Sequence, residues 1–216
     1  LQLNEPKGNR FAANTLTLQA ASMSVTSNPS FGSQTIVRGG ASKIGSVQFQ
    51  AGPAEKVQIQ SILISIDNDA AAELTVDDVL AGISNLSLKV ADKTIGTTIA
   101  SPSGAVSGNS FTVSGQLDVD ASATVTIDVY ADLATNADAT VRPFIPINGV
   151  TFVGATSSVS TTTPAAATAL QTITTAASGT LTATTPIQST QRVLHAGETG
   201  TELMSLKLEA ASEAVF

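Results

Sequence analysis

Apolar and polar residues alternate along one stretch of the chain after another, and this alternation limits the possible fold more than any other feature. In the stretch SVQFQA, Val47, Phe49 and Ala51 fall on one side of a strand, with Gln48 and Gln50 on the other. A period of two is typical of a β-strand with one buried face. The pattern recurs, with Gly, Asn, Asp or Ser in between, over 57–66, 86–90, 111–119 and 125–133. Strands at such regular steps predict an all-β sandwich.

Three details of these stretches carry local predictions. Between 57 and 66 the apolar parity switches at Gln60–Ser61, and a β-bulge there would keep both sets of apolar residues on the core side. Gly115 falls in register within the expected strand over 111–119. Pro143 and Pro146 predict that the extended segment containing them lies at an edge or bulge, because proline cannot donate a ladder hydrogen bond.

Two distant parts of the chain are similar. The stretch AASMSVTSNPSFGSQTIVRGG near the start resembles AASGTLTATTPIQSTQRVLHAG near the end, and the same spacing separates Pro29 from Pro186 and Gly40 from Gly197. After a slip of two residues, IGSVQFQA at 44–51 aligns with LMSLKLEA at 203–210, apolar position on apolar position. Chance similarity between two Thr/Ser/Ala-rich stretches is the alternative. A repeat of this length favours tandem units.

The repeat predicts four segments. Residues 1–19 would be the tail of a preceding segment, 20–154 one β-sandwich unit, 155–177 a Thr/Ser/Ala-rich extended connector, and 178–216 the first strands of a second, truncated repeat. The stretch LTVDDVLAGI is the one part of the sequence that could form a helical turn, and it is too short to change the fold class.

Composition excludes several functional classes. The 216 residues carry a formal net charge of −7, so a nucleic-acid partner is not expected. No apolar run approaches the ~20 residues that a membrane-spanning helix requires, so no membrane span is expected in this segment. The absence of cysteine excludes disulfides and thiolate chemistry. Only 12% of the residues are charged, about half the usual share, so the surface is mainly neutral and polar.

Three motifs resemble those of the large repeat-built surface proteins of bacteria, particularly of the patescibacterial lineages, whose Ig-like repeats tile along the chain. They are the opening GTLTATTPIQSTQRVLHAGETGTELMSLKLEAASEAV, the stretch VTIDVYADLATNADATVRPFI, and the exit GVTFVGAT. The first copy departs from this pattern, with AGPAEKV where the second has AASEAV. The resemblance implies an Ig-like β-sandwich, one complete repeat plus the start of a second, in an extracellular structural protein.

Acidic residues offer the one candidate metal site. Asp67, Asp69, Asp77 and Asp78 lie in the stretch DNDAAAELTVDD, and carboxylates on a turn are the hard oxygen ligands that Ca²⁺ prefers. The spacing is not that of an EF-hand, and solvated turn carboxylates are the alternative. We therefore predict at most a Ca²⁺ site at these four residues and no other cofactor. Asp118 and Asp120 form a second acidic pair.

Other chemistry-bearing residues favour structural roles. His195 is the only histidine, and Arg38 takes its place in the first copy, which favours a solvated polar position over a catalytic one. Asp128 and Asp132 flank Tyr130 on the polar side of one strand, too little aromatic area for a carbohydrate platform. Asn85 begins a glycosylation sequon within an expected strand. Nothing combines a nucleophile, a base and an orienting partner, so we predict no enzyme.

These observations predict a structural protein of the cell surface, secreted and self-assembling. Its β-sandwich repeats would associate with copies of themselves, by strand addition among other modes, into an S-layer, a filament or a stalk. An adhesive or glycan-binding surface module is the alternative function.

Overall fold

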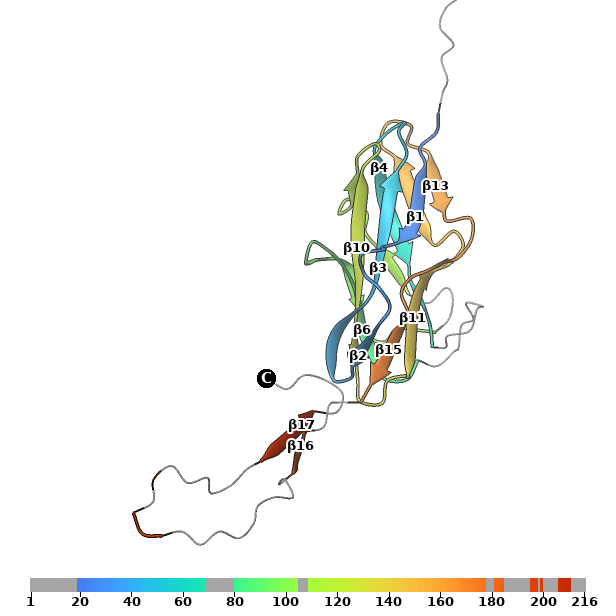
Figure 1. Ribbon diagram of the computed structural model, residues 1–216. Helices are drawn as coiled ribbons and strands as arrows, with labels where there is room; N and C mark the ends of the chain where they lie inside the picture. Colours follow the sequence, from blue (N-terminus) through green and yellow to red (C-terminus); the bar gives the residue numbers. More distant parts are fainter. Residues whose placement is uncertain are drawn as a thin grey trace, which may run out of the picture.

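The computed structural model describes residues 19–68, 80–104 and 109–177, with the short stretches 181–184, 195–197, 199 and 206–210. Every regular element in these residues is a β-strand, which confirms the all-β prediction, and none is a helix that could cross a membrane. Figure 1 shows the strands of residues 19–177 running along one long axis, in layers around a common core.

The largest sheet has the order β1-β3-β10-β6-β7, and all its pairings are antiparallel. Its strands are β1 (Met23–Ser27), β3 (Gly40–Ala51), β10 (Thr124–Leu133), β6 (Ile83–Val90) and β7 (Lys93–Ile99). Val47, Phe49 and Ala51 of β3 are buried while Gln50 is exposed, so the predicted alternation of this strand is confirmed. A bulge opposite Val129 and Tyr130 of β10 then brings four successive residues of β3 to buried positions.

Two shorter sheets complete the sandwich. One has the order β13-β12-β4-β8 with β9 also on β4, and the other has the order β14-β11-β15-β2 with β5 also on β11. Their strands are β13 (Ser160–Thr163), β12 (Val150–Gly154), β4 (Val57–Leu63), β8 (Ser110–Thr112), β9 (Asp118–Val119), β14 (Thr168–Ala169), β11 (Thr140–Ile145), β15 (Ile173–Ala176), β2 (Gln34–Val37) and β5 (Ser65–Asp67). Buried side chains from all three sheets join one hydrophobic cluster.

The bulge predicted in β4 is confirmed. The register between β4 and β12 shifts so that Gln60 is the extra residue, between Ile59 opposite Phe152 and Ser61 opposite Thr151. Five apolar side chains on the two sides of this bulge are fully buried: Val57, Ile59, Ile62, Ile64 and Ile66. One inserted residue therefore lets both parities face the core.

The expected strand over 111–119 is divided in two. Gly115 adopts φ +72° in a turn, and strands β8 and β9 on either side both pair with β4. Val113 donates to the carbonyl of Gln60, so the turn leaves the sheet beside the β4 bulge. The extra residue in β4 shifts the register of the sheet, and the turn between β8 and β9 compensates for that shift. Gly115 permits the turn because glycine readily adopts a positive φ.

Pro143 lies inside the sheet rather than at its edge. Strand β11 pairs with β5 on one side and with β14 and β15 on the other, and Pro143 stands opposite Ile66. Its carbonyl still accepts a hydrogen bond from Leu170, at 3.0 Å. The missing proline donor is accommodated because the partners of β11 change along its length.

The segment expected to be an extended connector contains three strands of the sandwich. β13 pairs with β12, β14 pairs with β11, and β15 lies between β11 and a parallel β2. Leu170 and Ile173 are buried in the core. The small, neutral Thr/Ser/Ala residues of this segment show no helical periodicity and no pattern of charges. They form strands here because they pair with strands that are distant in sequence.

Candidate functional site

Asp67, the first predicted calcium ligand, ends β5 and is 1% exposed. Its carboxylate forms an ion pair with Arg142, the residue directly opposite it on β11, which is 9% exposed. Asp69, Asp77 and Asp78 lie outside the described residues, so the structure does not bring the four together. Among the described residues no three His, Cys, Asp or Glu side chains form a metal-binding group. The calcium site stays a prediction.

Asp118 and Asp120 at the end of β9 hold Lys56, with Nζ–carboxylate distances of 2.9 and 3.8 Å. The hydrogen bond from Lys56 to Asp118 raises the pKa of the lysine, and the charge of Asp118 adds to the effect. These are exposed ion pairs at one end of the sandwich, whose contribution to folding is small.

Glu55, next to Lys56, caps the turn after β12. Its carboxylate accepts hydrogen bonds from the amides of Thr156 and Ser157, at 2.7 and 2.9 Å. The side-chain and backbone hydrogen bonds of Ser157, followed by that of Thr156, lower the pKa of Glu55 below its ordinary 4.5. An acidic residue with a lowered pKa stabilises the fold above its unfolded-state pKa, and that contribution is lost as the pH falls through the folded-state value.

A Glu55→Gln substitution is therefore expected to reduce stability at neutral pH and to lose this effect in acid. Denaturant unfolding of both proteins between neutral pH and pH values below the folded-state pKa would measure the difference. The difference in the free energy of unfolding should decrease as the pH falls. A difference that stays constant across this range would show that the charge of Glu55 does not stabilise the turn.

The polar face of β10 is occupied by neighbouring side chains. Asp128 accepts a hydrogen bond from Ser46 and pairs with Lys43, each at 2.6 Å, and Lys89 lies 4.2 Å from the ring centre of Tyr130. One face of the Tyr130 ring is thus covered by a cation.

Asn85 and Asp132 also meet on this sheet. The Asn85 amide donates to Asp132 at 2.6 Å, and Asn85 has φ +52°. The side-chain nitrogen that the sequon would present for glycosylation is therefore already hydrogen-bonded within the sheet.

His195 and Arg38, the aligned pair of the two copies, have different surroundings. His195 is exposed. Arg38 is half-buried at the end of β2, where its Nε donates to the Thr175 hydroxyl at 3.0 Å and its Nη1 to the Thr135 carbonyl at 3.4 Å. Arg38 thus fastens the last strand of the unit, β15, to the loop after β10.

Gln171 has a role that sequence reasoning missed. Its carboxamide accepts a hydrogen bond from the Ser46 amide at 2.8 Å and donates to the carbonyls of Ser46 and Asn28 at 3.1 and 3.0 Å. The regular pairing of β1 with β3 ends at Ser27, opposite Val47, one residue before Asn28. The Asn28 amide still donates to the Ser46 carbonyl at 3.0 Å, so the buried Gln171 side chain completes this last pair by satisfying the Ser46 amide and the Asn28 carbonyl.

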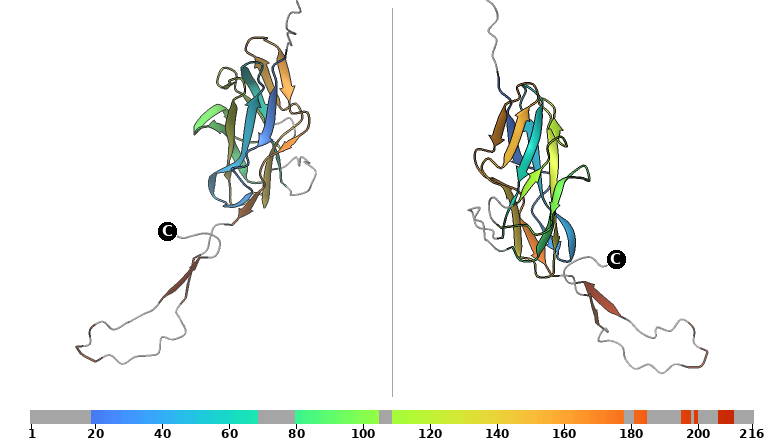
Figure 2. Two further views of the ribbon diagram at one scale, coloured as in Figure 1. Left: turned by 45° about the horizontal axis from the view of Figure 1, so that its top comes forward. Right: turned by 180° about the vertical axis from the view of Figure 1, so that it is seen from behind.

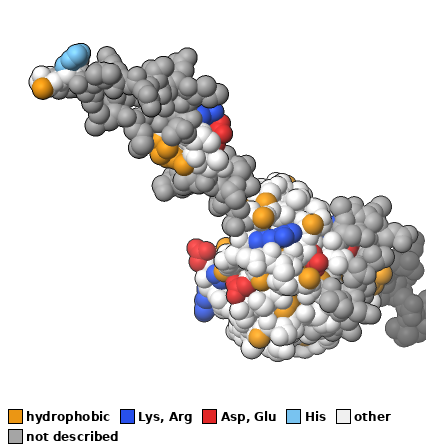
Figure 3. Space-filling view, turned by 90° about the horizontal axis from the view of Figure 1, so that it is seen from below, with side chains coloured by type: hydrophobic (Ala, Val, Ile, Leu, Met, Phe, Trp, Pro, Cys, Tyr) orange, Lys and Arg blue, Asp and Glu red, His pale blue; other side chains and the backbone are white. Residues whose placement is uncertain are grey.

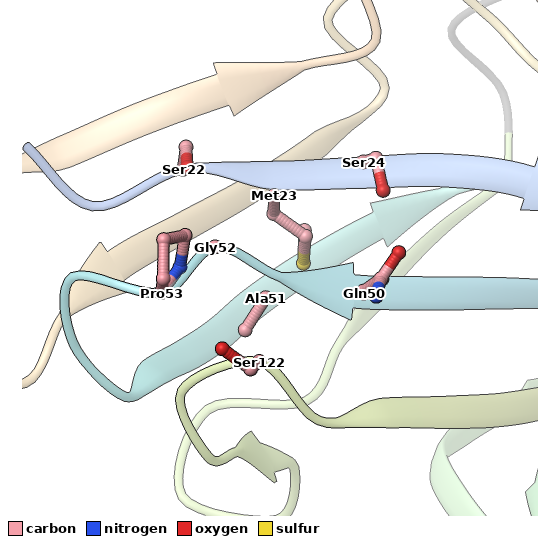
Figure 4. A pocket seen from close by; sticks show the side chains of 8 residues that line it. All are labelled: Ser22, Met23, Ser24, Gln50, Ala51, Gly52, Pro53 and Ser122. Atoms are coloured by element: carbon pink, nitrogen blue, oxygen red, sulfur yellow. The ribbon is translucent and has the colours of Figure 1, made fainter.

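A shallow hollow lies where the chain enters the sandwich. It is lined by Ser22, Met23, Ser24, Gln50, Ala51, Gly52, Pro53 and Ser122, and we call it the entry hollow. Ser24 and Gln50 are exposed and stand opposite each other on the paired strands β1 and β3 (Figure 4). Gly52 joins the rim by donating to the Ser22 carbonyl at 2.8 Å and accepting from the Ser122 amide at 3.0 Å.

A separate hairpin pairs β16 (Leu181–Thr184) with β17 (Lys207–Ala210). Leu181 stands opposite Ala210 and Ala183 opposite Leu208, as Met23 stands opposite Ala51 and Val25 opposite Phe49 in β1 and β3. The exposed fractions differ, since Leu208 is 57% exposed and Phe49 is fully buried. The hairpin therefore pairs its strands antiparallel, as β1 and β3 do, but one residue away from the register that aligning Pro29 with Pro186 and Ala51 with Ala210 would give, and without the burial of β3.

Comparison with known proteins gives little further identification. No protein-family model matches the chain, and no curated protein matches it significantly. Among solved structures, the chain is similar to the seventh ScaB type I cohesin from Pseudobacteroides cellulosolvens, at 14% identity and a TM-score of 0.37, over 79% of this chain and 98% of the cohesin. A TM-score this low does not establish a common fold, so the all-β class rests on the strands of the structure itself.

Proposed function

We propose that this chain is part of an extracellular structural protein whose β-sandwich units assemble into an S-layer, a filament or a stalk on the cell surface. The observation that carries the proposal is the antiparallel pairing shared by the β16–β17 and β1–β3 hairpins. The two segments that align with β1 and β3 in sequence also pair with each other. Tandem units of one kind are the building principle of elongated proteins.

The edges of the sandwich support side-by-side association. β13 (sequence STTT) and β2 (sequence QTIV) each end a sheet and contain no charged residue. Charged side chains and prolines on edge strands are the usual means of preventing contact between sheets of different molecules. These two strands lack that protection, which favours copies of the same chain as partners.

The full chain, concentrated stepwise with and without added calcium, is expected to form ordered filaments or lattices visible by electron microscopy. Analytical ultracentrifugation of the same samples would measure the loss of monomer. The matched control places lysine at Thr162 of β13, whose side chain is exposed. Lysine at an edge should suppress assembly without altering the fold. Monomer at every concentration, with and without calcium, would contradict the proposal.

A further inference from the structure

We infer that the entry hollow is the docking site for the far end of the preceding unit, which is a second copy of the same sandwich. Consecutive units would then dock end to end. This inference rests on the proposed tandem arrangement. The inference specifies which surfaces of neighbouring units are in contact, and it implies that the units are held rigidly relative to one another.

The chain enters and leaves a unit at opposite ends. Figures 1 and 2 show the start of β1 at one end of the sandwich and the end of β15 at the other, in every view. We call the second end the exit end; it carries Arg38, Gly39 and the loop after β10. In a series of such units, the exit end of one faces the entry hollow of the next.

Little free chain remains between the two ends. On the exit side the backbone is held up to Ala176, whose carbonyl accepts from the Arg38 amide at 2.9 Å. On the entry side it is held from Ser22 onward, through the hydrogen bond to Gly52. The hairpin pairing makes Leu181 the counterpart of Met23, and hence Thr180 the counterpart of Ser22, whereas the spacing of the two Pro and the two Gly residues makes Gly179 that counterpart.

At most Ala177, Ser178 and Gly179 therefore connect the segment that ends at Ala176 to the counterpart of Ser22. Four Cα–Cα steps, the larger of the two possibilities, span about 14 Å at full extension. Two sandwiches tethered this closely must place the exit end of the first against the strand ends that border the hollow of the second.

The chemistry of the two surfaces permits close contact. The hollow is lined by neutral side chains. Figure 3 views the molecule from the exit end and shows mainly uncharged side chains and backbone, with scattered basic and acidic groups. In the second copy Glu209 takes the place of Gln50, a lining residue of the hollow, and it is paired with Lys207 at 2.5 Å. Neither surface therefore carries a large net charge that would oppose the contact.

The test completes the second unit while keeping residues 1–214 unchanged. Residues 57–176 are joined after Ala214, so that Val57 takes the position of Val215. NMR relaxation then reports whether the two sandwiches tumble as one body. The expected result is one shared correlation time. A control with a Gly-Ser stretch inserted between Ser178 and Gly179 should lose it, because the tether no longer holds the ends together.

A bulky substitution in the hollow tests the contact itself. Thr182→Trp in the two-unit chain, at the exposed counterpart of the lining residue Ser24, is expected to shift the units toward separate tumbling, because the ring fills the hollow of the second unit. Two folded units that tumble separately in the parent chain would overturn the end-to-end docking alone. A second unit that does not fold would overturn the docking together with the tandem repeat on which the proposed function depends.

Discussion

Replacing Arg142 by leucine is expected to lower the free energy of unfolding by about 3–5 kcal/mol, because it leaves the carboxylate of Asp67 buried opposite an apolar side chain. For a domain of this size the loss corresponds to a fall of roughly 6–20 °C in melting temperature. Denaturant unfolding followed by circular dichroism would measure it. The effect is large because both members of the pair are shielded from water.

The double variant Arg142→Leu with Asp67→Leu distinguishes the interaction between the two residues from the contribution of each residue alone. Removing both charges is expected to recover most of the lost stability, since an apolar pair can replace a buried ion pair at little cost. Losses that simply add in the double variant would show that the two residues do not act together. Lys56→Met, which breaks an exposed ion pair, is the matched control and should change stability far less.

Replacing Gln171 by leucine is expected to cost about 2–4 kcal/mol, because the Ser46 amide and the Asn28 carbonyl lose buried partners at once, while the Ser46 carbonyl keeps only the Asn28 amide. Amide hydrogen exchange would add a local readout, since the Ser46 amide should lose its protection before the rest of β3.

The control for Gln171 is leucine at Gln34, an exposed glutamine on the edge strand β2. It should leave stability nearly unchanged. If Gln171→Leu were equally harmless, the carboxamide would not be completing the last pair of β1 and β3. Gln171→Glu keeps the acceptor and loses both donated hydrogen bonds, so we expect it to be destabilising as well.

The parts of the fold that depend on neighbouring residues could be predicted from the sequence. Buried and exposed positions at the end of β3, from Val47 to Ala51, follow a period of two, and the bulge at Gln60 follows from the change of parity between Ile59 and Ile62. Both signals arise because one face of a strand must be apolar wherever it meets the core.

Features that depend on distant partners could not be predicted. From the sequence alone, Asp67 is expected to be a carboxylate on a turn. Arg142 lies opposite it only because β5 pairs with β11. Gln171 lies in a Thr- and Ala-rich stretch, and its buried role depends on where β1 leaves β3. Strands β13 to β15 have the composition of a linker, and their register comes from β11, β12 and β2.

The parallel pairing of β15 with β2 has a mechanical consequence. A pull on the two ends of the unit draws β1 and β15 in opposite directions along the long axis of the sandwich. β1 would slide along β3, and β15 along β2 and β11, so the hydrogen bonds of each ladder bear the load together instead of opening one after another. A unit built in this way resists stretching along the direction in which its neighbours would transmit tension.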